Sequence, residues 1–520
     1  MLAYAIPDHP WIDSADGAAV RIAMTVAAPG HSDGILAIVT SEQARDDGEN
    51  EVVLVKSVGV LAPNLQIGAD LTSSGPLQAN SNLANHGVIR GGEGFLVKPD
   101  QLLPLGFGRQ PGIEKHLRPI LNGSDITSTS RANYVIDLYG LTEPEVRDQF
   151  PEIYQWVFTH VRPGRVNNKR TTRRDNWWLF NESVPKLRSM LVGLPRFIST
   201  SETAKHRVFV FVGESVLPEH KLVNIASDDA FVLGILSSSI HVTWSLASGS
   251  WLGVGNDSVY VKTRCFETFP FPALKEGYDK QRIRDLGERL DAHRKRQQEQ
   301  HPGLTLTGMY NVLEILRSGD PLTPKDKLIH DQGLVSVLRQ IHDELDAAVL
   351  EAYGWSDLKW GTGGPPVSSP TEHGQAARAP LEQAILTRLV ALNHERAAEE
   401  KRGLIRWLRP EFQAPQSSDG HRPPLQGEIE GIDTSENSTS NIQDSTFPDW
   451  PAELPAQVIA IRKLLPTIGQ SPDTSLPETS ASSVEPLAER LAACFGRKSK
   501  KRLDQITAIL DTLKALGLIA

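Results

Sequence analysis

Residues 194–212 read LPRFISTSETAKHRVFVFV, with two apolar runs around a short polar centre. The runs at 197–200 and 207–212 are strand-like, and the second is nearly continuous in apolar residues. A short continuous run of this kind is typical of a strand that is buried on both faces. We therefore expect buried strands in the middle of the chain.

The sequence before this stretch predicts further strands. Apolar and polar residues alternate over residues 18–26, as in a strand with one buried face, and residues 35–39 and 51–60 are also strand-like. Little sequence precedes residues 18–26 with which such a strand could pair. We expect these residues to be poorly supported unless a partner supplies their neighbours. The polar, Gly- and Asn-rich stretch at 72–94 is predicted to be a loop.

Helical signals dominate later in the chain. Thr142 and Glu145 form a possible capping box ahead of a helix that Pro151 kinks or restarts. Beyond Lys280 apolar residues recur at helical spacing, and Gly354 is placed to end one of these helices. The expected helices there include residues 283–290, 334–349 and 381–392.

Composition excludes several classes of protein. No apolar run approaches the roughly 20 residues that span a bilayer, and Pro7 and Asp8 rule out a signal-peptide core at the start. We expect a cytoplasmic protein with no membrane partner. The only cysteines, Cys265 and Cys494, lie far apart in the sequence, so neither a disulfide framework nor a cysteine-based zinc site is expected.

Positive charge is concentrated between residues 160 and 210. This stretch has eleven basic and three acidic residues, a net charge of +8, although the whole chain carries −9. Lys and Arg contacts to phosphates supply most of the sequence-independent affinity for nucleic acid, and Asn and Arg can read base edges. Asn167, Asn168, Trp177 and Trp178 lie in the same stretch. The residues alone leave two interpretations open: a surface that binds a polyanion, or a solvated charged surface beside two core tryptophans.

Several blocks of the sequence resemble one family. AIPDHPWIDSADGAAVRIAMTV (5–26) resembles the last strands of the methyltransferase domain in large MmeI-like restriction-modification DNA methyltransferases. Later blocks resemble, in order, the target-recognition region and the helical tail of that family. They include GIEKHLRPILNGSDI (112–126), YVIDLYGLTEPEVRDQFPEIYQWV (134–157), the stretch at 194–212, WLGVGNDSVYVKTRCFETFPFP (251–272), LTLTGMYNVLE (304–314), HDELDAAVLEAYGW (342–355) and LVALNHERAAEEKRGLIRWLRPEFQ (389–413).

The resemblance and the residue pattern together predict an α+β fold. A mixed α/β target-recognition domain is followed by a helical region and a small helical C-terminal domain. The stretch between those two helical parts has no aromatic residue and is rich in Ser, Pro, Asp and Asn, which predicts disorder. The expected divisions are residues 1–60, terminal strands of a truncated methyltransferase domain; 61–274, target-recognition and DNA-binding domain; 275–412, helical region; 413–446, disordered linker; and 447–520, small helical domain.

By the same resemblance, the basic stretch becomes the expected contact surface for double-stranded DNA. For most of its residues backbone positioning is expected rather than base readout. A hydrogen-bonded core histidine is the alternative for His206, and Asn256 with Asp257 is expected to form a turn. The expected DNA contacts are Arg162, Arg165, Lys169, Arg170, Arg173, Arg174, Lys205, His206 and Arg207.

The chemistry of methyl transfer is missing from the sequence. In the family, adenine-N6 transfer needs a glycine-rich turn that holds S-adenosylmethionine and an Asn/Asp-Pro-Pro-aromatic motif that holds the flipped base. The Pro pairs at 365–366 and 423–424 are followed by Val and Leu, and the GVG at 253–255 reads as a turn. The EHK at 219–221 lacks the preceding aspartate that a Mg²⁺-dependent nuclease needs. We expect no catalytic, cofactor-binding or metal-binding residues in this chain.

Three functions are compatible with these observations. The favoured one is the DNA-recognition part of an adenine-specific methyltransferase, inactive alone, as a truncated product or with a separate S-adenosylmethionine-binding methyltransferase subunit. The second is a standalone, non-catalytic DNA-binding protein like a specificity subunit. The third is an RNA-binding protein, because basic residues interleaved with aromatics also suit single strands.

Overall fold

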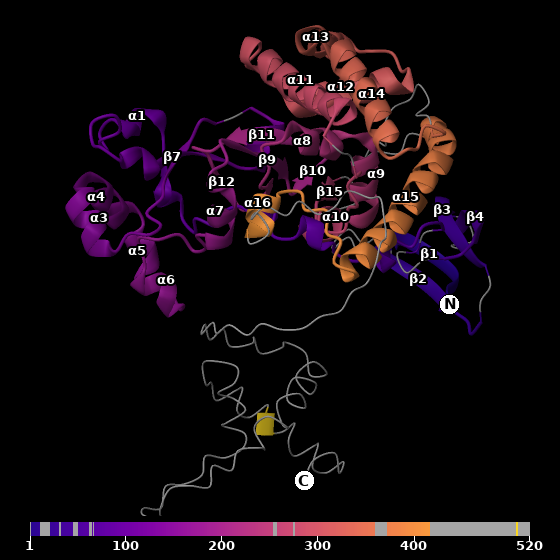
Figure 1. Ribbon diagram of the computed structural model, residues 1–520, viewed down its shortest axis with the longest axis horizontal. Coiled ribbons are helices and arrows are strands. Elements are labelled where there is room, and N and C mark those ends of the chain that lie inside the picture. Colours follow the sequence, from indigo (N-terminus) through magenta and orange to yellow (C-terminus); the bar gives the residue numbers. More distant parts are fainter. Residues whose placement is uncertain are drawn as a thin grey trace, which may run out of the picture. The chain divides into compact units, whose positions relative to one another are not determined.

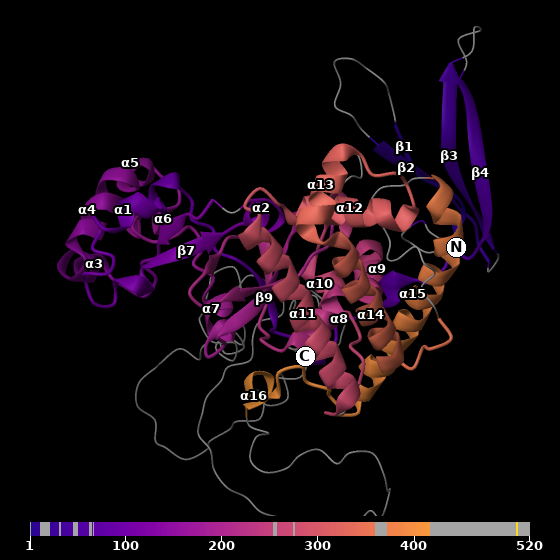
Figure 2. The ribbon, with the colours of Figure 1, turned by 90° about the horizontal axis from the view of Figure 1, so that it is seen from above.

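The computed structural model describes residues 2–10, 21–30, 33–44, 50–61, 65, 67–129, 131–252, 257–273, 276–358, 372–415 and 506–507. The chain divides into two units, Met1–Pro423 and Pro424–Ala520. Apart from Ile506 and Thr507, the second unit lies outside the described residues, as do most of the predicted linker and the predicted C-terminal helical domain. Figures 1 and 2 show the helices and strands of the first unit from two directions.

The stretch 194–212 forms two neighbouring strands of a buried antiparallel sheet, β9 inside the sheet and β11 at its edge. The strand order is β11-β9-β13-β5, and the register places Val210 opposite Ser199 and Asn224 opposite Asn85. The second strand starts at Val210 rather than at Arg207. The four strands are β5 (Ala84–His86), β9 (Arg196–Ser201), β11 (Val210–Gly213) and β13 (Leu222–Ile225).

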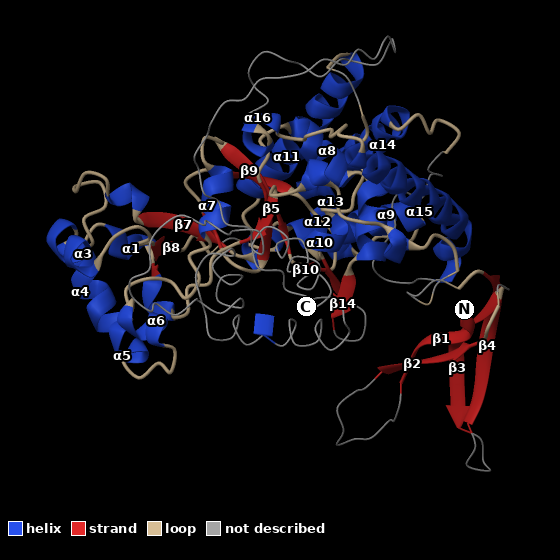
Figure 3. Cartoon of the chain, turned by 60° about the horizontal axis from the view of Figure 1, so that its bottom comes forward, coloured by secondary structure: helices blue, strands red, loops and turns tan. Residues whose placement is uncertain are grey.

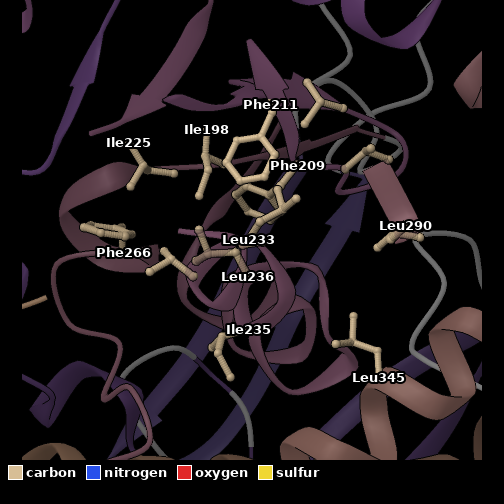
Figure 4. Close-up of a cluster of buried hydrophobic side chains, with 14 of the residues drawn as sticks. Ile198, Phe209, Phe211, Ile225, Leu233, Ile235, Leu236, Phe266, Leu290 and Leu345 are labelled. Atoms are coloured by element: carbon tan, nitrogen blue, oxygen red, sulfur yellow. The ribbon is translucent and has the colours of Figure 1, made fainter. Parts of the chain in front are cut away.

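Helix α8 (Ala230–Ser237) packs against this sheet and is buried along its whole length. Figure 4 shows Ile198 and Phe211 of the sheet beside Leu233 and Leu236 of the helix. A helix that is apolar on all sides belongs in the interior of a large core. We call the sheet, α8 and the helices packed on them the central body.

The remaining helices of the central body follow the predicted periodicity. The helices expected at 283–290, 334–349 and 381–392 are confirmed, and Gly354 adopts a positive φ of +72° just after its helix ends. They are α7 (Pro185–Leu191), α9 (Ser239–Ser248), α10 (Lys262–Cys265), α11 (Tyr278–Gln300), α12 (Leu306–Ser318), α13 (Pro324–Gly333), α14 (Val335–Ala352), α15 (Glu372–Lys401) and α16 (Pro410–Gln413).

Among the described residues, no single helix is long and apolar enough to cross a membrane. Helices α8 and α9 pass that test only jointly, as a pair bent by 63°. Both helices contribute buried side chains to the core of the central body.

A small lobe, residues 88–182, has a hydrophobic core of its own that also receives Leu217. The predicted capping box is confirmed: Thr142 N donates to Glu145 Oε2 at 2.7 Å, and Pro151 begins a second helix. Its sheet has the order β12-β7-β8-β6. The elements are β6 (Leu96–Val97), α1 (Pro99–Leu102), β7 (Leu117–Leu121), α2 (Gly123–Thr127), β8 (Tyr134–Ile136), α3 (Glu143–Gln149), α4 (Pro151–His160), α5 (Arg162–Arg165), α6 (Thr171–Asp175) and β12 (Leu217–Pro218).

The small lobe is joined to the central body by backbone pairing and buried charge. Strand β12 lies in the sequence between β11 and β13 of the central body, and it pairs in parallel with β7 of the lobe. Beside it, Arg118 donates to the carbonyl oxygens of Glu214 and Ser215 at 2.7 and 2.9 Å. Asp137, which is buried, accepts two hydrogen bonds from Arg188 at 2.7 and 2.9 Å. Breaking such a buried pair is costly, so these contacts resist movement of the lobe.

The first strands form a separate four-stranded sheet of order β2-β1-β3-β4. The expectation that residues 18–26 are poorly supported without a partner is wrong for residues 21–26, because β1 pairs with β2 and places Tyr4 opposite Val26; residues 18–20 lie outside the described residues. The prolines in β1 hid this strand from the sequence pattern. The strands are β1 (Leu2–Pro10), β2 (Arg21–Ala27), β3 (Gly34–Ala44) and β4 (Asn50–Gly59).

The composition of residues 72–94 predicted a loop, and this is only partly right. The stretch also contains β5, an edge strand of the central sheet. Helix α15 holds the irregular part. Glu400 accepts from the backbone N–H groups of Gln78 and Ala79 at 2.7 and 2.8 Å, and Asn393 donates to the Gly75 carbonyl at 2.9 Å. Its short helical turns are η1 (Leu71–Ser73), η2 (Gln78–Asn80) and η3 (Glu93–Phe95).

Candidate nucleic-acid interface

The basic residues at 162–174 lie on α5, α6 and the loop between them, at the edge of the small lobe (Figure 1). Trp177 and Trp178 are buried in the lobe core, as the alternative interpretation predicted for them. The Arg162 guanidinium lies 4.6 Å from the Phe158 ring centroid and 5.9 Å from that of Trp177. Stacking on aromatic rings holds a guanidinium in place without neutralising its charge. Phe158 and Trp177 therefore support the exposed Arg162 side chain.

Several of these cations have no acidic partner in the part of the chain that the structure describes. Lys169 and Arg170 are exposed and Arg173 is half-buried, and none of the three makes an ion pair with a described residue. Arg174 lies 3.3 Å from the carboxylate of its neighbour Asp175. We call residues 162–174 the basic arm. Unpaired cations of this kind on one short segment are available to an external polyanion.

Arg165 differs from its neighbours in the basic arm and is corrected to a structural residue. Its side chain is buried, its Nη2 donates to the Arg90 carbonyl at 3.0 Å, and its guanidinium lies 5.6 Å from the Phe95 ring centroid. Burial lowers the pKa of the Arg165 guanidinium. This side chain ties α5 to the lobe and does not face solvent.

Lys205 and His206 are not in the basic arm but on the central body, beside α12. Lys205 Nζ donates to Asn311 Oδ1 at 2.6 Å and lies 3.7 Å from Glu314. The His206 ring nitrogens lie 2.8 Å from Asn311 Oδ1 and 3.1 Å from Glu314 Oε1. The sequence stretch 160–210 therefore does not form one continuous surface, and these two residues already have internal partners.

Arg207 is the clearest correction to the expected DNA contacts. Its guanidinium is buried and donates to Thr200 Oγ1 at 3.2 Å, to the Ser201 carbonyl, and to Ser258 O and Oγ at 2.9 and 3.0 Å. Burial lowers its pKa to about 10, so it stays charged at neutral pH. Arg207 joins the central sheet to a second, three-stranded sheet of order β10-β15-β14. These strands are β10 (Thr203–Ala204), β14 (Ser250–Leu252) and β15 (Asp257–Val259).

The environment of Arg207 extends into a second buried polar pair. The His241 ring lies 2.9 Å, through Nε2, from the Tyr260 hydroxyl, and the Arg207 guanidinium lies 5.2 Å from the Tyr260 ring centroid. Burial, with Arg207 as a lesser cause, lowers the pKa of His241 to about 3. His241 is therefore neutral at physiological pH. These groups are part of the core and are closed to ligands.

The side chains of the EHK triplet at 219–221 do not converge on one site. Glu219 pairs with Arg90 at 2.7 Å, and Lys221 pairs with Glu202 at 2.8 Å, so the two charges of the EHK triplet face different partners. Among the residues with described positions, no group of three or more His, Cys, Asp or Glu side chains could hold a metal ion. Asp257 lies in β15, whereas Asn256 of the predicted turn falls outside the described residues.

Comparison with known proteins agrees with this architecture. Residues 89–273 match the sequence model of the family described as MmeI, target recognition domain. The fold is similar to the solved structure of the Type IIL restriction-modification enzyme MmeI in complex with DNA, with a TM-score of 0.53 and 16% sequence identity. That match covers 76% of this chain and 46% of the MmeI chain, so the chain spans about half the length of that enzyme. No curated protein matches the sequence.

The fold and the sequence match together define residues 89–273 as a target recognition domain. The domain is of the MmeI type, so the chain contains an MmeI-like target recognition domain, and its fold is α+β, as its sequence blocks predicted. The matched residues include nearly all of the small lobe, strands β9, β11 and β13 of the central sheet, and the three-stranded sheet, whereas β5 precedes them.

The two kinds of arginine in this domain should differ in their effect on stability. We expect Arg207→Met to lower the free energy of unfolding by about 3 kcal/mol, because it leaves buried carbonyl and hydroxyl acceptors without donors. Arg170→Met, at an exposed position, should change it by no more than about 0.5 kcal/mol. Chemical unfolding of both variants measures the difference. Equal effects would show that Arg207 is not the buried cross-link described above.

Proposed function

We propose that this chain recognises a specific sequence in double-stranded DNA as part of a restriction-modification or phage-defence system. The observation that carries the proposal is the MmeI-type target recognition domain at 89–273 with unpaired cations on its basic arm. A restriction-modification protein acts on DNA, and we expect this one to act in the cytoplasm. An RNA-binding function has no comparable support.

In this proposal the basic arm positions the domain on the duplex. Lys169, Arg170 and Arg173 contact phosphate oxygens, which releases condensed counterions and makes affinity depend strongly on salt. Such contacts set register and orientation but carry no sequence information. Sequence would be read by side chains elsewhere in the domain that reach base edges.

Methyl transfer in this proposal is supplied by another polypeptide or domain. The family's enzymes transfer a methyl group from S-adenosylmethionine to adenine N6, and the sequence of this chain contains neither the glycine-rich turn nor the Asn/Asp-Pro-Pro-aromatic motif for that step. No residue of this chain is therefore assigned to S-adenosylmethionine. What its residues contribute is binding, orientation and selection of the DNA site.

The N-terminal sheet supports a partner of this kind. Cross-strand neighbours share a face of a sheet, and Ile35 with Val58 lie on one face while Ile38 with Val55 lie on the other. Their exposed fractions are 36%, 69%, 49% and 53%. Apolar residues on both faces are typical of a sheet covered on both sides, as in α/β domains. We infer that the S-adenosylmethionine-binding partner covers these faces.

The basic arm gives the first prediction for this function. Replacing Lys169, Arg170 and Arg173 by Ala should weaken binding to duplex DNA at every sequence. The slope of log K against log[salt] should also fall by about one for each phosphate that the arm no longer neutralises. Fluorescence anisotropy with duplex fragments at several salt concentrations measures both quantities.

A matched variant controls for loss of charge. Lys325, Lys327 and Arg402 are exposed cations outside the target recognition domain, and replacing all three by Ala should leave affinity and salt slope nearly unchanged. Equal losses in the two triple variants would contradict a specific role for the basic arm. Tighter binding of the wild type to single-stranded RNA than to duplex DNA would reject the proposed function.

The N-terminal sheet gives the second prediction. Val55→Asp with Val58→Asp should abolish co-purification with a protein that carries the two missing motifs, because each face would then bury a charge at the interface. Leu328→Asp with Val337→Asp, also at exposed apolar positions, should leave the complex intact. If both pairs co-purify equally well with the partner, the sheet is not the contact surface.

A further inference from the structure

The target recognition domain exposes two large apolar side chains on the short hairpin of β14 and β15. Trp251 is 43% exposed and Leu252 is 53% exposed, whereas Trp177, Trp178 and Trp244 of the same domain are buried. Exposed single apolar residues are common. Trp251 and Leu252 are neighbours on an edge strand. Packing against the described residues does not explain why both are exposed to solvent.

The base of this hairpin is rigidly held. Ser258 lies opposite Trp251 in the register, and its backbone and side-chain oxygens accept the two hydrogen bonds from Arg207. At the start of β14 a Cβ on Gly249 would lie 2.6 Å from the Val259 carbonyl oxygen and 2.7 Å from that of Ser245. Only glycine tolerates such close backbone approach, so the strand leaves α9 in one direction. The two exposed side chains are presented by a fixed support.

Their arrangement has the shape of a wedge rather than of a flat patch. Consecutive residues of a strand point to opposite faces. Trp251 therefore shares a face with the buried Ser258, and Leu252 shares the other face with the exposed Asp257, so the two side chains project on either side of β14. A stable protein partner needs roughly 800 Å² on each side, which is far more than two side chains offer. Insertion into a base stack needs only one or two apolar side chains.

The position of the hairpin also suits duplex DNA. It lies within the matched domain, and in Figure 3 β14 is at the lower edge of the central body while α5 and α6 are at the lower edge of the small lobe. Asp257, opposite Leu252, would repel phosphates but could accept a hydrogen bond from a base-edge amino group. The Asp257 carboxylate therefore favours contact of this strand pair with DNA bases over contact with the phosphate backbone of the DNA.

We propose that Trp251 and Leu252 insert between base pairs of the DNA bound by the basic arm, unstacking one step. This inference rests on the proposed function. Unstacking would lower the free-energy cost of extruding a base from the duplex. Enzymes that modify a base within duplex DNA need this extrusion.

Permanganate oxidation, which attacks unstacked thymines, tests the proposal on a pool of genomic duplex fragments. Wild-type protein should create hyperreactive thymines in the fragments it retains. Trp251→Ala with Leu252→Ala should abolish them and weaken binding at least about tenfold, whereas Trp251→Phe with Leu252→Met should keep both. The matched control is Tyr278→Ala with Leu328→Ala, an exposed aromatic and leucine outside the matched domain, which should behave as wild type.

The outcomes separate this proposal from the one it rests on. If the wild type fails to bind duplex DNA, the proposed function is wrong. If it binds without reactive thymines, or if the Ala pair binds and reacts like wild type, the wedge alone is rejected. Photocrosslinking of wild type to duplexes that contain 5-iodouracil decides independently of folding: crosslinked peptides should contain Trp251, and crosslinks confined to the small lobe would overturn the insertion.

Discussion

The arrangement of the two sheets in the recognition domain depends on the hydrogen bonds of the buried Arg207 guanidinium. It bonds to Thr200 and Ser201 of the central sheet and to Ser258 of the three-stranded sheet. A charge in the interior is tolerated only when its donors are satisfied, and this requirement fixes the two sheets to each other. The hydrogen bonds of Arg207 therefore hold the strand pair that carries Trp251 in a fixed position relative to β9.

The rest of the domain separates charge that holds the fold from charge that faces solvent. Arg118, Arg165, Arg188 and Arg207 are engaged with internal acceptors, whereas Lys169 and Arg170 have no acidic partner among the described residues. Within the stretch at 160–210, whose net charge is +8, Arg165, Arg188 and Arg207 bond to internal acceptors, whereas Lys169 and Arg170 are exposed. The small lobe keeps the basic arm in place because strand pairing and the ion pair of the buried Asp137 with Arg188 join the lobe to the central body.

The fold was predictable where local pattern and burial agree. The apolar runs at 197–200 and 207–212, the Thr142 capping box and the helices from Lys280 onward are all local signals. The structure confirms them, although the second strand begins only at Val210. Strand β1 was missed because its prolines disguise it, and β5 because three residues carry no periodicity. Which arginines are buried could not be predicted, since Arg165 and Arg170 look alike until tertiary contacts give one of them internal acceptors.

We propose that this chain recognises a specific sequence in double-stranded DNA. Selection from a random duplex library with the isolated chain, followed by sequencing of the bound fraction, tests this proposal. We expect enrichment of one short motif. Retention of duplexes with no enriched motif would contradict it, because the basic arm would then be supplying only sequence-independent affinity.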